Sequence, residues 1–186
     1  MALNLSGAFT ALVTPFRSDG SLDLDALARL VEWQIESGIS GLVPCGSTGE
    51  SATLTPEEHI RVVRHVVEVA SGRVPVVAGT GSNSTREAIE LTAAARSAGA
   101  DGALLISPYY NKPTQEGIYQ HYRMVALEGG LPIVLYNIPG RTASRIESAT
   151  TARLSRVPGV AGLKECGGDF AATAETIQSV APGFAV

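Results

Sequence analysis

The sequence predicts an α/β fold built from repeated strand–helix units, as in a (β/α)₈ TIM barrel. Short apolar runs alternate with amphipathic segments along all 186 residues, which is typical of helices packed around a parallel sheet. A unit recurs about every thirty residues, and right-handed crossovers of this length add neighbouring parallel strands. A doubly wound open sheet is the runner-up, but it predicts a glycine-rich turn where Thr14-Pro15-Phe16 stands.

Six strands are predicted from apolar runs of strand length that are bounded by turn residues. They are Ala8–Val13, Gly41–Cys45, Val74–Gly79, Gly102–Ile106, Leu131–Tyr136 and Gly159–Lys164. Residues 183–186 resemble the beginning of a seventh strand. Because a complete barrel has about 250 residues, we expect residues 1–186 to form one incomplete barrel domain, the N-terminal portion of a longer chain. Such a piece is expected to show little turnover and to expose sheet edges.

Capping residues mark the helices between these strands. Asp23 is a predicted N-cap, and Gly38 follows the end of the same helix. Thr55-Pro56-Glu57-Glu58 predicts a capping box with proline at the first helical position, and this helix is expected to stop near Gly72. The other helices are expected to start at Asn83 or Ser84, Thr114, Glu147 or Ser148, and Asp169.

Composition excludes several classes of function. The net charge of −4 and the lack of any Lys/Arg cluster argue against nucleic acid as a partner. Every apolar stretch is too short for a membrane span. Cys45 and Cys166 are too few for a disulfide framework and no export signal is visible, so a cytoplasmic protein is expected. The three histidines lack zinc-site spacing, so no metal is expected.

Lys164 ends one predicted strand, and Tyr136 ends the strand before it. Neighbouring parallel strands would therefore offer an amine and a phenol to one place. A lysine after a strand is usually a solvated charge at the rim. When such an amine is partly desolvated, it can instead attack a carbonyl and form a Schiff base.

Four motifs follow strands and favour the Schiff-base interpretation. They are Gly46-Ser47-Thr48-Gly49-Glu50-Ser51-Ala52-Thr53-Leu54, Pro108-Tyr109-Tyr110-Asn111-Lys112-Pro113, Tyr136-Asn137-Ile138-Pro139-Gly140-Arg141-Thr142 and Gly162-Leu163-Lys164-Glu165. At these residues, from Phe9 to the last residue, the chain resembles the pyruvate-dependent class I aldolase family, most closely its dihydrodipicolinate synthase branch. The resemblance implies a TIM-barrel lyase and no cofactor.

The resemblance also implies catalytic roles. Lys164 would form the imine with pyruvate, and Tyr136 would move protons, with Ser47 and Tyr110 completing a relay. A relay is needed because a phenol has an unperturbed pKa of about 10. The family would place Tyr110 against a neighbouring subunit, in a homotetramer that is a dimer of dimers. Synthases more usually carry threonine at Ser47, and either hydroxyl serves the relay.

Substrate contacts follow from the same resemblance. Thr48 and the backbone around Gly49 would bind the pyruvate carboxylate, and Arg141 would bind the carboxylate of L-aspartate 4-semialdehyde. The implied reaction is their condensation to 4-hydroxy-tetrahydrodipicolinate, on the way to diaminopimelate and lysine. The alternatives are another pyruvate aldolase, of the N-acetylneuraminate lyase or the 4-hydroxy-2-oxoglutarate or sugar-acid aldolase type, or a truncated non-catalytic chain.

A regulatory L-lysine site is the last implication. The matching positions are Ser51, Ala52, His59, Asn83, Glu87 and Tyr109. Their local alternative is ordinary capping, since Asn83 can be an N-cap and Glu87 a first-turn acid. Pro56 stands where inhibited relatives often have a second histidine, so inhibition weaker than in those relatives is expected.

Overall fold

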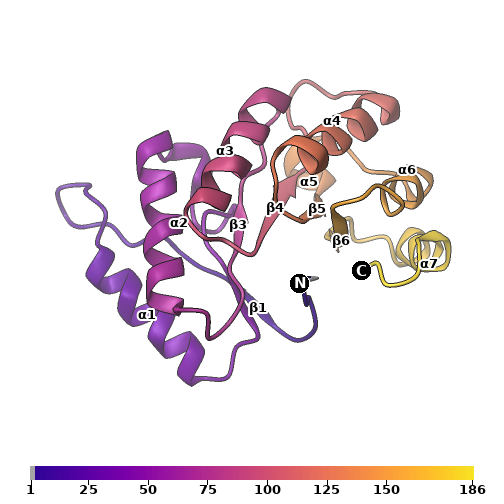
Figure 1. The fold of residues 1–186 in the computed structure, drawn as a ribbon. Coiled ribbons are helices and arrows are strands. Elements are labelled where there is room, and N and C mark those ends of the chain that lie inside the picture. The colour runs from indigo at the N-terminus through magenta and orange to yellow at the C-terminus, as the bar shows by residue number, and fades with distance from the viewer. Residues whose placement is uncertain (1–2) are drawn as a thin grey trace. The chain divides into compact units, whose positions relative to one another are not determined.

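Strands and helices alternate through the part of the chain that the structure describes, residues 3–186 of a computed structural model (Figure 1). In chain order the elements are β1 (Phe9–Ala11), α1 (Leu24–Glu36), β2 (Gly41–Val43), the 3₁₀ helix η1 (Ser51–Thr53), α2 (Pro56–Ala70), β3 (Val77–Gly79), α3 (Thr85–Ser97), β4 (Gly102–Ile106), α4 (Gln115–Glu128), β5 (Ile133–Asn137), α5 (Pro139–Thr142), α6 (Ser148–Leu154), β6 (Val160–Glu165) and α7 (Phe170–Ser179). Each predicted strand overlaps an observed one, so the predicted βα alternation is confirmed.

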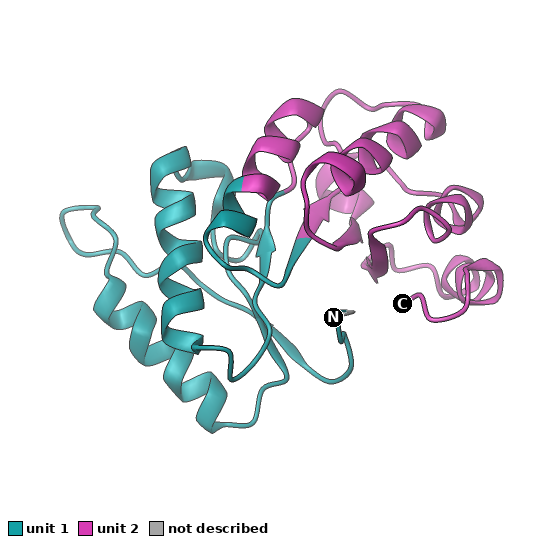
Figure 2. Cartoon of the chain, viewed as in Figure 1, with its two compact units in different colours: residues 1–80, 94–103 teal, residues 81–93, 104–186 magenta. Residues whose placement is uncertain are grey.

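Two compact units make up the chain and are coloured separately in Figure 2. Unit 1 contains residues 1–80 and 94–103, and unit 2 contains residues 81–93 and 104–186. The boundaries pass through α3 and β4, so each of these elements begins in one unit and ends in the other. The carboxyl ends of β2 and β3 belong to unit 1, whereas those of β4, β5 and β6 belong to unit 2.

Unit 1 is built on the parallel pair β1 and β2, in which Thr10 is opposite Leu42. Leu42 also forms a parallel bridge with Val76, just before β3. α1 and α2 pack against each other, and each contributes buried apolar side chains such as Val31 and Val63. These residues recur at helical spacing, so folding gathers them on one face of each helix.

Local hydrogen bonds explain where the helices of unit 1 begin. The Asp23 carboxylate accepts a hydrogen bond from the backbone N–H of Ala26 at 2.9 Å. The Thr55 hydroxyl accepts from the N–H of Glu58 at 3.2 Å, and the Glu58 carboxylate accepts from the N–H of Thr55 at 2.9 Å. Both predicted starts are therefore confirmed, including the reciprocal capping box.

Unit 2 contains β5 and β6 as a parallel pair, and α4, α6 and α7 pack in succession. Its core includes Tyr122, whose hydroxyl donates to the Leu105 carbonyl at 3.1 Å. Burial lowers the pKa of the neighbouring His121 to about 4, so that ring is neutral at pH 7. The predicted caps Thr114 and Asp169 each accept a hydrogen bond from the first turn of α4 and α7.

The predicted beginning of a seventh strand is also confirmed. Ala185 forms a parallel bridge with Gly162 of β6. The Ala185 carbonyl accepts from the N–H of Leu163 at 2.8 Å, and the Ala185 N–H donates to the carbonyl of Ala161 at 3.2 Å. β6 is thus hydrogen-bonded on both sides, by β5 and by the residues around Ala185.

Two short helical segments were not predicted. Residues 139–142 form the single helical turn α5, with Pro139 at its start and the N–H of Ala143 donating to the Pro139 carbonyl at 2.9 Å. η1 follows Glu50 in the same way, through a 3.0 Å bond from the Thr53 N–H to the Glu50 carbonyl. Segments of three or four residues show no helical periodicity, so their sequence pattern is uninformative.

Membrane, metal and thiol chemistry can be described for residues 3–186. No helix in this range has the length and apolar character to cross a bilayer. The same residues contain no group of three or more His, Cys, Asp or Glu side chains that could hold a metal ion. Both cysteines are free, and burial raises the pKa of the Cys45 thiol to about 12, so this thiol is a poor nucleophile near neutral pH.

Candidate active site

Lys164 and Tyr136 lie beside each other at the carboxyl ends of β6 and β5, in unit 2. Their Cα atoms are register partners, and Nζ of Lys164 is 4.3 Å from the centre of the Tyr136 ring. Opposite residues of paired strands project to the same face, so amine and phenol share one side of the sheet. Tyr136 is buried but Lys164 is exposed, so the expected desolvation of the amine is absent among the described residues.

The pairing of Lys164 with Tyr136 depends on a bulge in β6. Ile133 is opposite Val160, but the next residue of β5, Val134, is opposite Gly162. Ala161 is therefore an extra residue with no partner in β5. Every later pair is shifted by one residue, and a shift of one residue exchanges the two faces of a strand.

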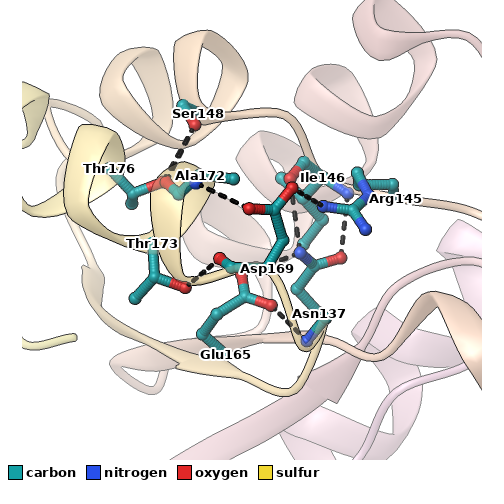
Figure 3. Close-up of polar contacts among 10 residues, drawn as sticks. Asn137, Arg145, Ile146, Ser148, Glu165, Asp169, Ala172, Thr173 and Thr176 are labelled. Carbon is teal, nitrogen blue, oxygen red and sulfur yellow. Dashed lines mark hydrogen bonds and ion pairs between the residues drawn. The ribbon is translucent and has the colours of Figure 1, made fainter.

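Asn137 and Glu165 form the next pair after Tyr136 and Lys164, so they project to the opposite face. Figure 3 shows these two side chains pointing toward each other. Nδ2 of Asn137 donates to Oε2 of Glu165 at 2.8 Å. Oδ1 of Asn137 accepts from the N–H of Ile146 at 3.0 Å, and Oε1 of Glu165 accepts from the N–H of Gly167 at 2.5 Å. Sequence reasoning missed this pair, although each residue directly follows a proposed catalytic residue.

A cavity of about 300 Å³ lies on this opposite face. Its wall includes Asn137 and Glu165 together with residues of α6 and α7 and of the segment before α6. Arg145, also in the wall, lies 3.8 Å from the Asp169 carboxylate. Figure 3 shows these two side chains facing each other. Polar and apolar side chains both line the cavity, which lies on the other side of the β5–β6 ladder from the Lys164 amine.

Arg141 is exposed on α5, whose position is set by buried hydroxyl groups. The hydroxyl of Thr142 lies 2.8 Å from the Ser144 carbonyl and 3.3 Å from the hydroxyl of Ser107, which follows β4. The carbonyl of Thr142 accepts from the N–H of Tyr110 at 3.3 Å. Contacts of Thr142 therefore join the segment carrying Arg141 to the segment carrying Tyr110.

Tyr110 has an unusual backbone and a solvent-exposed side chain. Its φ is 72°, and 87% of its surface is exposed. Non-glycine residues adopt this left-handed conformation at a cost of about 1 kcal/mol, and such strain clusters at functional sites. The ring is thus held out from the part of the chain that the structure describes.

The Gly46–Gly49 turn follows β2 in unit 1. The N–H of Gly49 donates to the Gly46 carbonyl at 3.0 Å, and the Thr14 hydroxyl donates to the Gly49 carbonyl at 2.7 Å. A Cβ at Gly49 would lie 3.0 Å from the carbonyl oxygen of Leu12, so a larger residue would press against the main chain in this tight turn. Ser47 and Thr48 are exposed beside it.

The residues matched to a lysine site divide between the units. In unit 2, Nδ2 of Asn83 donates to the Tyr109 carbonyl at 3.2 Å, and Glu87 accepts a hydrogen bond from the Ser82 hydroxyl. In unit 1, Ser51 and Ala52 belong to η1, and the buried His59 donates from Nε2 to the Gly79 carbonyl at 2.8 Å. In unit 2, a hydrogen bond thus joins Asn83 to Tyr109. In unit 1, the Gly79 carbonyl fixes the His59 ring.

Comparisons with known proteins agree on one family. The sequence matches the dihydrodipicolinate synthetase family over residues 4–186. A 4-hydroxy-tetrahydrodipicolinate synthase from Nitratidesulfovibrio vulgaris (strain Miyazaki F) is 56% identical over 185 residues, which are 99% of this chain and 63% of that protein. The chain thus spans just under two thirds of the length of this curated relative.

Similar solved structures also include dihydrodipicolinate synthases. A dihydrodipicolinate synthase from Acinetobacter baumannii, complexed with pyruvate, matches 98% of this chain and 63% of its own with a TM-score of 0.96 and 48% identity. The enzyme from Cyanidioschyzon merolae with lysine bound matches 96% of this chain and 61% of its own, with a TM-score of 0.92 and 40% identity. The predicted fold class, part of a TIM barrel, is thereby confirmed, and the chain belongs to the dihydrodipicolinate synthetase family.

Proposed function

We propose that the protein condenses pyruvate with L-aspartate 4-semialdehyde to 4-hydroxy-tetrahydrodipicolinate through a Schiff base on Lys164. The observation that carries this proposal is the Lys164 amine 4.3 Å from the Tyr136 ring, at the ends of two paired strands. The relatives named above support the reaction, and one of them is a complex with pyruvate. In this reaction the amine attacks the ketone carbon, water leaves, and the resulting imine nitrogen accepts electrons when a methyl proton is removed.

Proton transfer is assigned to Tyr136, with Ser47 and Tyr110 as the other hydroxyl groups of the relay. The Tyr136 ring is buried beside the Lys164 amine, so the surrounding packing holds the phenol in place. The resulting enamine would attack the aldehyde carbon, and the new alkoxide would take a proton from the relay. Thr48 and the backbone around Gly49 are assigned to the pyruvate carboxylate, and Arg141 to the carboxylate of the semialdehyde.

Assembly and location belong to the same proposal. The exposed, strained Tyr110 is a suitable group to enter a neighbouring subunit, in a homotetramer arranged as a dimer of dimers. Both cysteines are free thiols, which supports a reducing, cytoplasmic environment.

The substrate assignment is tested by offering alternative aldehydes. The purified chain at stoichiometric concentration is incubated with pyruvate and aspartate semialdehyde, N-acetylmannosamine or glyoxylate, and products are identified by mass spectrometry. A condensation product with aspartate semialdehyde alone is expected. Arg141→Ala should slow this condensation about 100-fold, because a bidentate carboxylate contact is lost, without changing pyruvate imine formation.

Arg153→Ala is the matched control, since Arg153 is another exposed arginine of unit 2, paired with Glu116. It should leave the condensation unchanged. A product with N-acetylmannosamine or glyoxylate in place of aspartate semialdehyde would assign the chain to another aldolase activity.

Inhibition by L-lysine is the regulatory part of the proposal. A lysine-bound relative supports it, and Glu87 offers a carboxylate for an ammonium group beside the Asn83–Tyr109 hydrogen bond. We expect lysine to slow the condensation, less strongly than in relatives with a second histidine, because Pro56 has no side-chain group that could hydrogen-bond an ammonium. Glu87→Ala should raise the inhibitory lysine concentration about 10- to 100-fold, through loss of a charge-assisted hydrogen bond.

The control is Glu90→Ala, an exposed carboxylate on the same helix α3. A lysine titration of the three proteins compares them directly. Equal inhibition of the wild type and the Glu87→Ala variant would contradict this site.

A further inference from the structure

We infer that Asn137 and Glu165 are positioning residues that hold β6 in the bulged register and thereby keep Lys164 beside Tyr136. This inference rests on the proposed Schiff-base function and adds to it a device located on the other face of the sheet. Neither side chain shares the face of the Lys164 amine, so both act through the backbone register.

Without the bulge, β5 and β6 would pair in a different register. Ile133 is opposite Val160, so an unbroken ladder would put Tyr136, three residues later, opposite Leu163, and Asn137 opposite Lys164. Lys164 would then project to the face of Asn137, away from the Tyr136 ring. The observed pairing of Lys164 with Tyr136 exists only because Ala161 is left out of the ladder.

The backbone of Ile146 orients the Asn137 side chain independently of β6. Its Oδ1 accepts from the N–H of Ile146 at 3.0 Å, and its Nδ2 lies 3.4 Å from the Ile146 carbonyl. An amide has one acceptor oxygen and two N–H donors, and the donor at Ile146 determines which end is the oxygen. The remaining N–H points at Glu165, and the side chain is only 1% exposed.

Glu165 can accept a hydrogen bond from this donor only in the observed register. Its Oε2 accepts from Asn137 at 2.8 Å, and its Oε1 accepts from the N–H of Gly167 at 2.5 Å. A backbone hydrogen bond fits the same register, since the Asn137 carbonyl accepts from the N–H of Cys166 at 2.8 Å. In the register without the bulge, the N–H donor of Asn137 would face the Lys164 ammonium, which is also a donor. The Glu165 carboxylate would then lose its hydrogen bond to Asn137.

The test compares Glu165→Ala with Glu165→Gln in the purified chain. Glutamine removes the charge but keeps one acceptor oxygen, whereas alanine removes charge and acceptors together. Glu175→Ala is the matched control, because Glu175 is an exposed carboxylate in the wall of the same cavity and, among the described residues, its side chain is not hydrogen-bonded to Asn137. Circular dichroism verifies that each variant is folded, and Glu165→Gln decides the outcome if the alanine variant is not.

Two measurements report the pairing register of β5 and β6 without any substrate. The ε-methylene protons of Lys164 should be shifted upfield by the Tyr136 ring in NMR spectra, and the Cys166 amide should be protected from hydrogen exchange. Glu165→Ala should lose both signals, Glu165→Gln should be intermediate, and Glu175→Ala should match the wild type. An unchanged Lys164 shift and unchanged Cys166 protection in Glu165→Ala would overturn the inference.

A third measurement reports the rate of imine formation between Lys164 and pyruvate. The rate of borohydride trapping at saturating pyruvate should fall about 100-fold in Glu165→Ala, the effect of misplacing a reacting group by about 1 Å, at an unchanged half-saturating pyruvate concentration. Equal losses in the alanine and glutamine variants would show an effect of charge alone and would also overturn the inference. If the wild type traps no pyruvate, the proposed function fails, while the NMR measurements still decide the register.

Discussion

Replacing Lys164 by alanine is expected to abolish covalent trapping of pyruvate. Sodium borohydride reduces an imine to a stable amine, so the wild-type chain treated with pyruvate should gain one adduct on the peptide that contains Lys164. Loss of a nucleophile typically slows a covalent step by about 10³-fold or more, so the variant should show no adduct on the same time scale. Peptide mass spectrometry after proteolysis measures the yield and locates the adduct.

The sequence provides an unusually clean control for this experiment. Its only lysines are Lys112 and Lys164, so Lys112→Ala removes the one competing side-chain amine. Lys112 lies in the segment after β4 with a φ of 46°, away from the paired ends of β5 and β6 in the sequence. The Lys112→Ala chain should trap pyruvate like the wild type. An adduct that maps to Lys112, or that persists in Lys164→Ala, would contradict the assignment.

Gly79→Ala is expected to destabilise unit 1 severely. A Cβ at this position would lie 2.1 Å from the carbonyl oxygen of Cys45, which is far inside van der Waals contact. Neither backbone can move easily, because the N–H of Gly79 donates to the Pro44 carbonyl at 2.9 Å and the Gly79 carbonyl accepts from His59 at 2.8 Å. Overpacking of this kind costs about 3 kcal/mol of unfolding free energy.

Urea unfolding followed by circular dichroism measures that cost as a lower midpoint with an unchanged slope. Gly140→Ala is the control, since a Cβ there has no atom within 4 Å and the residue lies in the helical turn α5. The control should remain within about 0.5 kcal/mol of the wild type. An equal midpoint for Gly79→Ala and the wild type would show that β2 and β3 are not as closely packed as the structure indicates.

Helix starts were predictable because their determinants are local. The Thr55–Glu58 capping box and the Asp23 cap involve residues three apart, so the pattern and the hydrogen bonds coincide. Strand positions were predictable to within a few residues, since apolar runs are bounded by turn residues. α5 escaped prediction because a single helical turn has no periodicity, and its place is set by Thr142 and by contacts from Ser107 far along the chain.

Some candidate site residues were likewise predictable from local sequence, whereas others depend on contacts between distant parts of the chain. Lys164, Tyr136 and Arg141 could be named from motifs, because each stands at or after a recognisable strand end. Asn137 and Glu165 stand in the same motifs but could not be paired, because their hydrogen bond joins residues 28 apart. A polar residue beside a catalytic one has no distinctive pattern until the partner strand is known.

The sequence by itself determined the βα order, the helix caps and the family, because these follow from local patterns and from motifs in a given order. Only the tertiary structure decided which face of β6 carries the lysine. That choice depends on the unpaired Ala161 and on the Asn137–Glu165 hydrogen bond, and both exist only between strands. Side chains alternate along a strand, so one extra residue moves Lys164 from the face of Asn137 to the face of Tyr136.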